Sequence, residues 1–391
     1  MAVPLYNLEP VLAILAFGLL LALAPVLWVF RRQGQGSASP GARWHALTLL
    51  TLFLTLDLVL FGAFTRLSDS GLGCPDWPGC YGEASPFAAH APIHAAQTAM
   101  PQGPVTVSKA WVEMVHRYLA TAVGALITLL MLASWQQMRK AQAARRWGDW
   151  LPTLTFVWVC VQGAFGALTV TMKLFPAIVS AHLLGAYGLL ALLTVQAVRT
   201  GALPTQTTRA WRWTLAALAL LLLQAASGAW VSTNYAVLVC SEFPLCQGQW
   251  WPAMDFARGF EIWRPLGESA DGTVLSLQAL TAIHIAHRSL ALLTLTALAG
   301  LAWHLRRQQP VQARWLAALL ALQLLTGLSN VVLGWPMAAA ILHTGGAAAL
   351  VAVLVWALAA RPAARPAQTL ARGAQTLAQP MPQPLPQRPT P

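Results

Sequence analysis

Residues 111–135 read WVEMVHRYLATAVGALITLLMLASW, and this stretch decides the class of the fold. It is long enough to cross a bilayer as an α-helix, which takes about 20 mostly apolar residues. Eight further stretches share its apolar character, at 9–30, 46–65, 151–172, 176–198, 211–233, 276–303, 313–334 and 337–360. We therefore predict an all-α polytopic membrane protein with nine transmembrane helices.

The composition agrees with this class. Hydrophobic residues make up 57% of the 391 residues, charged residues only 9%, and the mean hydropathy is +0.58. An ordinary soluble domain contains about 25% charged residues, so a soluble fold is excluded. The net charge of +12 does not indicate nucleic-acid binding, because the basic residues lie mainly in short loops that flank membrane spans.

The positions of Lys and Arg predict the orientation. Arg31 and Arg32 follow the first apolar stretch instead of preceding it, which favours an uncleaved anchor over a signal peptide. With these residues inside, seventeen Lys and Arg residues lie in inner segments and five outside. We expect a bacterial inner-membrane protein, surrounded by membrane lipid, with a periplasmic N-terminus and a cytoplasmic C-terminus.

An internal repeat organises the chain. Cys240 and Cys246 follow Cys74 and Cys80 by 166 residues each, and His287 follows His116 by 171. We predict two pseudo-symmetric four-helix bundles, eight core helices in all, over residues 46–198 and 199–360. Residues 1–45 would form an extra transmembrane anchor with a cytoplasmic linker. The Ala-, Gln- and Pro-rich residues 361–391 would form a disordered cytoplasmic tail.

Four histidines lie inside apolar stretches, each on the second or fourth helix of a half: His116, His182, His287 and His343. Ionisable side chains are costly inside a bilayer and usually mark function. Paired imidazoles from facing helices are axial ligands that a buried haem iron can use. A lone histidine is more often a hydrogen-bonded core residue. Four at repeat-related positions and similar depth favour two haem sites, one in each half.

The two halves differ beside their first histidine. Glu113 lies one helical turn before His116, whereas His284 stands at the matching place in the second half. We therefore assign chemistry to the first half, with Glu113 relaying protons or stabilising positive charge. The alternative is an interfacial carboxylate that pairs with Lys109.

Two arginines and one aspartate remain to be interpreted. Arg117 and Arg288, each next to a histidine, could contact haem propionates or simply reach the membrane interface. For Asp57, in the middle of a span, a proton path and a hydrogen bond to a neighbour are equally open.

Two long outer loops hold four of the five cysteines. Because the compartment outside an inner membrane is oxidising, each Cys-x5-Cys could close into a disulfide. A structural staple and a redox role are equally open for both pairs. Cys160, alone in a span, is predicted to be a small apolar packing residue.

The chain closely resembles haem A synthases over nearly all of residues 46–360. The resemblance is carried by TRLSDSGLGCPDWPGC (65–80), WVEMVHRYLA (111–120), AHLLGAY (181–187), CSEFPLC (240–246), HIAHRSLA (284–291) and LHTGG (342–346). It implies an oxidoreductase that converts the C8 methyl group of haem O to a formyl group by successive hydroxylations. The product, haem A, is used in cytochrome oxidase assembly.

Carried over by position, the resemblance implies roles for individual residues. His116 and His182 would bind the iron of the substrate haem O, with Glu113 as the catalytic acid. His287 and His343 would bind the iron of a resident haem B. The disulfides would pair Cys74 with Cys80 and Cys240 with Cys246.

The resemblance also implies a haem O synthase as a partner. It leaves open the electron acceptor or donor, the oxygen source and whether the chain forms a homo-oligomer. Two other functions compete with this interpretation. One is a non-catalytic bis-histidine cytochrome that moves electrons between quinone and the outer cysteine pairs. The other is a haem transporter or chaperone.

Overall fold

The computed structural model describes residues 8–34, 40–140, 147–201 and 210–359. The predicted tail at 361–391 lies outside these residues. Within them the secondary structure is helical, with isolated β-bridges and no strands. The helices are α1 (Glu9–Gly34), α2 (Pro40–Leu67), α3 (His90–Ala99), α4 (Val107–Lys140), α5 (Leu151–Thr171), α6 (Pro176–Arg199), α7 (Trp211–Thr233), α8 (Phe256–Gly259), α9 (Leu277–Leu305), α10 (Pro310–Val332) and α11 (Met337–Ala359).

Nine of the helices in the described part are long and apolar enough to span a membrane, and they coincide with the nine predicted stretches. The all-α polytopic class is therefore confirmed. The short helix α3 lies in the loop between α2 and α4, and α8 lies in the loop between α7 and α9. Two 3₁₀ turns, at Trp147–Trp150 and Ala236–Val239, complete the helical elements.

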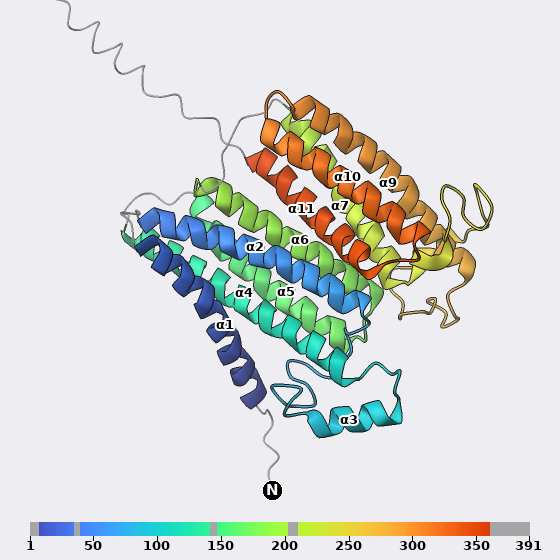
Figure 1. Cartoon of the computed structure of the whole chain (residues 1–391), viewed down its shortest axis with the longest axis horizontal. Helices are drawn as coiled ribbons and strands as arrows, with labels where there is room; N and C mark the ends of the chain where they lie inside the picture. Colours follow the sequence, from blue (N-terminus) through green and yellow to red (C-terminus); the bar gives the residue numbers. More distant parts are fainter. Residues whose placement is uncertain (1–7, 35–39, 141–146, 202–209, 360–391) are drawn as a thin grey trace, which may run out of the picture.

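The long helices pack as two four-helix groups. In the first, α2 contacts α4 and α6, and α5 contacts α4 and α6; in the second, α9 contacts α7 and α10, and α11 contacts α7 and α10. The groups meet where α11 packs against α2 and α6 and where α6 packs against α7. Figure 1 shows α1 outside this arrangement, packed on α4 and α2.

Left-handed backbone recurs at repeat-related positions in the two groups. The pairs are Asp69 and Tyr235 (φ 50° and 53°), Tyr81 and Gln247 (53° and 54°), Lys173 and Gly334 (51° and 68°), and Leu174 and Trp335 (57° and 65°). Non-glycine residues seldom adopt positive φ. Its recurrence at offsets of 166 and 161 residues supports the internal repeat independently of hydropathy.

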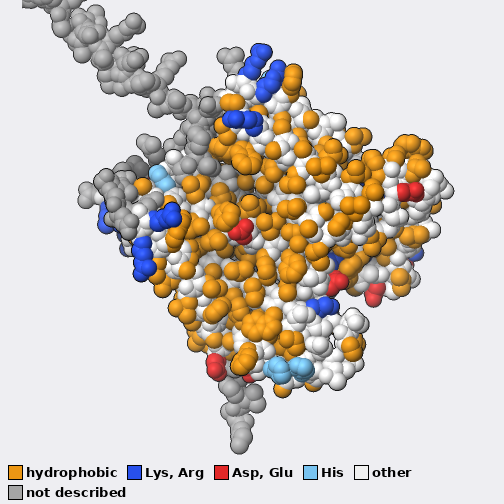
Figure 2. All heavy atoms as spheres, viewed as in Figure 1, with side chains coloured by type: hydrophobic (Ala, Val, Ile, Leu, Met, Phe, Trp, Pro, Cys, Tyr) orange, Lys and Arg blue, Asp and Glu red, His pale blue; other side chains and the backbone are white. Residues whose placement is uncertain are grey.

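The outer surface suits a bilayer. Hydrophobic side chains cover most of the visible face, and Lys and Arg gather largely at the end of the bundle away from α3 (Figure 2). Large apolar side chains such as Leu19, Phe53 and Leu292 are exposed on the long helices. In water such a surface would be unfavourable, whereas lipid solvates it without cost.

Candidate functional site

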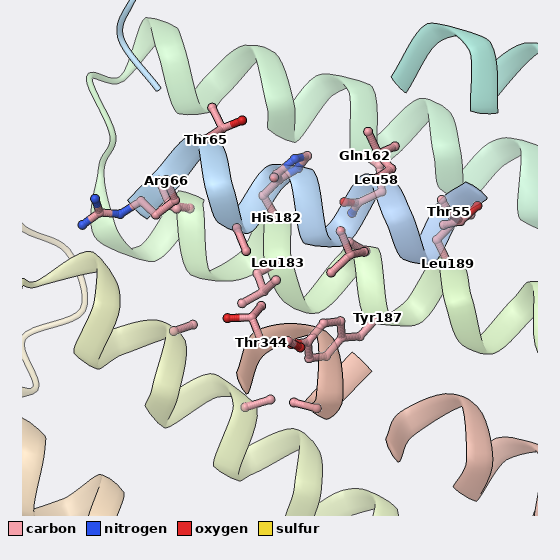
Figure 3. Close-up of a pocket in the computed structure, with 18 of the residues that line it drawn as sticks. Thr55, Leu58, Thr65, Arg66, Gln162, His182, Leu183, Tyr187, Leu189 and Thr344 are labelled. Atoms are coloured by element: carbon pink, nitrogen blue, oxygen red, sulfur yellow. The ribbon is translucent and has the colours of Figure 1, made fainter. Parts of the chain in front are cut away.

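A cavity of about 1400 Å³ runs through both four-helix groups. It is lined by all four predicted histidines, and also by Glu113, His284, Arg117 and Arg288. Figure 3 shows part of its wall, with His182 and Gln162 on the side of the first group. Nearby, the Tyr187 hydroxyl donates a 3.0 Å hydrogen bond to the Thr344 carbonyl of α11, so this wall continues into the second group.

The structure brings the histidines together in the predicted pairs. His116 on α4 and His182 on α6 line the cavity in the first group. His287 on α9 and His343 on α11 line it in the second. Each pair joins the second and fourth helix of its group, the arrangement in which bundle proteins hold cofactors.

A glycine on the preceding helix lies against each of these histidines. A Cβ atom added at Gly62, Gly166, Gly228 or Gly327 would lie 3.1, 3.5, 3.0 or 3.2 Å from Cε1 of His116, His182, His287 or His343, respectively. The missing side chain lets each ring lie close against that helix. Each of the four imidazoles therefore packs against a glycine, an arrangement called its glycine seat below. Paired nitrogen donors in an apolar cavity fit the axial ligation of a haem.

Sequence reasoning did not select these glycines. The signal was present, because Gly228 follows Gly62 by 166 residues and Gly327 follows Gly166 by 161. These are the offsets of the cysteine pairs and of His182 to His343. A search for repeated small residues beside the histidines would have found them.

The Nδ1 atoms of the histidines differ between the groups. Nδ1 of His287 lies 2.8 Å from the Ser227 hydroxyl, and Nδ1 of His343 lies 2.9 Å from the Thr326 hydroxyl. In the first group, Nδ1 of His116 and Nδ1 of His182 are buried without a hydrogen-bond partner among the described residues. The sequence reasoning did not select Ser227 or Thr326.

Glu113 is buried, with 4% of its surface exposed, and it is held at both oxygens. One accepts a 2.8 Å hydrogen bond from the Cys74 amide, and the other forms an ion pair with Arg117. The alternative partner, Lys109, donates instead to the Gly103 carbonyl at 3.1 Å. The alternative pairing with Lys109 is therefore wrong, because the ion pair is formed by Arg117, one helical turn after Glu113.

Both arginines beside the histidines contact the disulfide loops. Arg117 donates to the Pro78 carbonyl at 3.1 Å and to the Gly79 carbonyl. Arg288 donates to the carbonyl groups of Leu245, Cys240 and Glu242 at 3.0, 3.0 and 2.9 Å. The two side chains thus fasten each outer loop to the helix that carries a cavity histidine. Contact with haem propionates stays a prediction.

His284, which replaces Glu113 in the second group, also contacts loop backbone. It is 3% exposed, and its Nδ1 lies 2.7 Å from the Ala236 carbonyl oxygen. A carbonyl can only accept, so Nδ1 carries the proton. His284 therefore holds the backbone that follows α7, much as Glu113 holds the Cys74 backbone.

Both predicted disulfides are present. Cys74 pairs with Cys80 and Cys240 pairs with Cys246, with Cα atoms 4.9 and 4.7 Å apart. All four cysteines are buried. Cys160, by contrast, is a free and exposed cysteine on α5 that lines the cavity, so the prediction that it is a packing residue is wrong. Hydropathy does not show which side of a helix is covered by neighbouring helices.

Asp57 lies on α2 with an exposed side chain. Within the described part of the chain no hydrogen bond to it is found, so the structure offers no neighbouring helix as its partner. The proton path stays a hypothesis.

Comparison with known proteins gives a consistent result. The cytochrome oxidase assembly protein family matches residues 42–355. The chain is 40% identical over 314 residues to the heme A synthase of Shewanella oneidensis, covering 78% of this chain and 93% of that protein. It is 27% identical over 348 residues to the heme A synthase of Caulobacter vibrioides, covering 80% and 94%. The family match begins at residue 42, after the end of α1.

Proposed function

The chain belongs to the cytochrome oxidase assembly protein family, and from this premise we propose that it is a haem A synthase, an oxidoreductase that makes haem A from haem O. The observation that carries this proposal is the pair of imidazole couples in one apolar cavity, each ring seated against a glycine. The reaction converts the C8 methyl group to a formyl group through successive hydroxylations and loss of water.

His116 and His182 hold the iron of haem O in this proposal. Both line the cavity, His116 from α4 and His182 from α6. Apolar side chains around them, such as Leu183 and Val179, suit the porphyrin ring and exclude water. A haem supplies one-electron chemistry when bound. The protein contributes its position and its surroundings.

Glu113 is the proposed catalytic residue. It lines the same cavity, one helical turn from His116, so both side chains lie on one face of α4. Arg117 and the Cys74 amide hold the carboxylate in one orientation at the cavity wall. Arg117 is also its counter-ion, so no ion from solvent is needed. A carboxylate held in this way can accept a proton or stabilise positive charge that develops on the substrate.

His287 and His343 hold a resident haem B in this proposal. The second group has no acidic side chain at the place of Glu113, because His284 occupies it. The second site therefore lacks the group that would carry substrate chemistry. Passing electrons to or from the first site is the role that suits it.

The orientation and partners complete the proposal. The chain is a multi-pass membrane protein, and the Lys and Arg distribution supports an inner-membrane location with the loops of α3 and α8 in the periplasm. A haem O synthase is the expected supplier of substrate. We also propose a homo-oligomer, in which the exposed apolar face of α1 contacts a second copy of this chain.

The decisive experiment is extraction of haems from the purified protein after co-expression with a haem O source, followed by chromatography and mass spectrometry. Haem A or its hydroxylated intermediate, together with haem B, is the expected result. Haem B alone, with haem O supplied and unchanged, would instead indicate an electron-transferring cytochrome. Unchanged haem O bound without haem B would indicate a transporter.

A further inference from the structure

The Thr326 hydroxyl lies between Nδ1 of His343 and a carbonyl of its own helix. It is 2.7 Å from the Leu322 carbonyl oxygen and 2.9 Å from Nδ1 of His343. When the hydroxyl hydrogen is on Leu322, the hydroxyl oxygen accepts from Nδ1, which then carries the proton. The lone pair of the imidazole is then on Nε2. A histidine ligand whose other nitrogen donates to a protein acceptor is held in orientation and is a stronger base toward iron.

Ser227 makes the same arrangement with His287. Its hydroxyl donates to the Gln224 carbonyl at 2.8 Å, and its oxygen lies 2.8 Å from Nδ1 of His287. The Gln224 Nε2 lies 3.1 Å from that Nδ1, and the Gln224 Oε1 is buried without a partner among the described residues. Exchanging the two atoms by a flip of the carboxamide satisfies both groups, because Oε1 then accepts from Nδ1. In both histidines of the second group, Nδ1 thus contacts a hydroxyl of the preceding membrane-spanning helix, α7 for His287 and α10 for His343.

The first group lacks these contacts. The repeat offsets place Phe61 where Ser227 stands and Phe165 where Thr326 stands. The Phe61 ring is stacked on that of His116, with ring centroids 6.1 Å apart and an interplanar angle of 8°. Nδ1 of His116 and Nδ1 of His182 are buried without a partner in the described structure. A buried polar atom without a partner requires an explanation.

We infer that Ser227 and Thr326 are positioning residues that make the second pair of histidines permanent ligands, whereas Phe61 and Phe165 leave the first pair able to exchange. The inference rests on the proposed function. A substrate site has to take up haem O and release haem A, so its ligands must leave the iron in every cycle. A resident haem has no such requirement. The difference in Nδ1 partners matches this division of tasks.

The first test measures haem release. Purified Ser227→Ala and Thr326→Val proteins, loaded with haem B, are mixed with an apoglobin that captures free haem, and the transfer is followed by absorbance. Release from the second site is expected to be about 10- to 100-fold faster than in the unaltered protein. Thr296→Val is the matched control, because the Thr296 hydroxyl bonds only to Leu292 and Leu293 of its own helix. Unchanged release in both variants would overturn the inference.

The second test compares the two sites directly. His287→Ala and His116→Ala proteins, each reconstituted with haem B, report on the first and second site, respectively. Cyanide replaces a histidine only after that ligand leaves the iron. It is expected to bind about 10-fold faster in His287→Ala, and introducing Phe61→Ser there is expected to slow it. Equal rates at the two sites would contradict the inference. Failure of the unaltered protein to bind any haem would instead contradict the proposed function.

Discussion

The Tyr235 hydroxyl donates a 2.7 Å hydrogen bond to the Asp69 carboxylate, and the two residues occupy equivalent positions in the two halves, 166 residues apart. Beside them, Arg66 donates to the Ser232 carbonyl at 2.7 Å, and these residues are also 166 apart. Equivalent residues meet only near the axis that relates two repeats. The pseudo-two-fold axis of the bundle therefore passes between the outer ends of α2 and α7.

Replacing Tyr235 with Phe tests this contact. The variant is expected to lose about 0.5–1.5 kcal/mol of stability, because one hydrogen bond between the halves is removed. Thermal unfolding in detergent measures the loss, and a double-mutant cycle with Asp69→Ala isolates the pair. Burial raises the pKa of Tyr235. Its folded state therefore favours the neutral phenol, so this contribution is present below about pH 10 and declines as the pH rises through the raised value. Additive losses in the cycle would show that the pair does not couple.

Two replacements of Glu113 distinguish the effect of its negative charge from that of its hydrogen bond with the Cys74 amide. Glu113→Gln keeps an oxygen for the Cys74 amide, and Glu113→Ala removes it. Both variants are expected to retain haem O with little or no haem A, as determined by mass spectrometry of extracted haems, because both lack the carboxylate. Glu242→Gln is the control, since that exposed carboxylate accepts from the Gly248 amide in the second loop. Normal haem A yield from Glu113→Gln would exclude a catalytic role.

Removing one histidine ligand identifies the two sites. As isolated, before any haem is added, His287→Ala is expected to lack haem B in the second site and to keep the capacity to bind haem in the first site, because His116 and His182 are untouched. His116→Ala is expected to show the reverse. Visible spectra and extracted haems of the two proteins decide the outcome. Full retention of haem B in His287→Ala would reverse the assignment of the halves.

The glycine seats can be tested by adding a methyl group. A Cβ atom at position 228 would lie 3.0 Å from Cε1 of His287, so Gly228→Ala must push the ring aside. We expect weaker haem retention and an altered visible spectrum. The matched control is Gly300→Ala on α9, where an added Cβ meets nothing within 4 Å. That control is expected to be neutral or to gain up to about 1 kcal/mol of stability. Identical spectra for both variants would mean that the seat does not position the ring.

Replacing the disulfides distinguishes a structural staple from a redox role. Each bridge closes a short loop with a sequence separation of 6, so converting either pair to Ser should cost about 2 kcal/mol of stability. If the bridges act as staples, Cys74→Ser with Cys80→Ser lowers the haem A yield, because the Cys74 amide holds Glu113. The Cys240→Ser and Cys246→Ser pair should then leave the yield nearly normal. Complete loss of haem A in both double variants would favour electron transfer through the cysteines.

Hydropathy predicted the helices well because each span is a local property of the chain. The ends were less accurate: α4 runs from Val107 to Lys140, beyond the predicted 111–135 at both ends. Polar residues continue the helix outside the apolar stretch, where hydropathy carries no signal. The exposure of Cys160 was missed for a related reason, because burial depends on the rotation of a helix about its axis.

The sequence by itself determined the nine spans, the two-fold repeat, the cysteine pairs and the four histidines, because each is written in local composition or in recurring spacing. Only the tertiary structure decided what each side chain contacts. It paired Glu113 with Arg117 and the Cys74 amide, and it turned Arg117 and Arg288 onto loop carbonyls. Among the described residues it also left Nδ1 of His116 buried without a partner, whereas the Ser227 hydroxyl lies 2.8 Å from Nδ1 of His287. These contacts join segments distant in the chain, and they depend on helix rotation and on atomic distances that spacing alone does not specify.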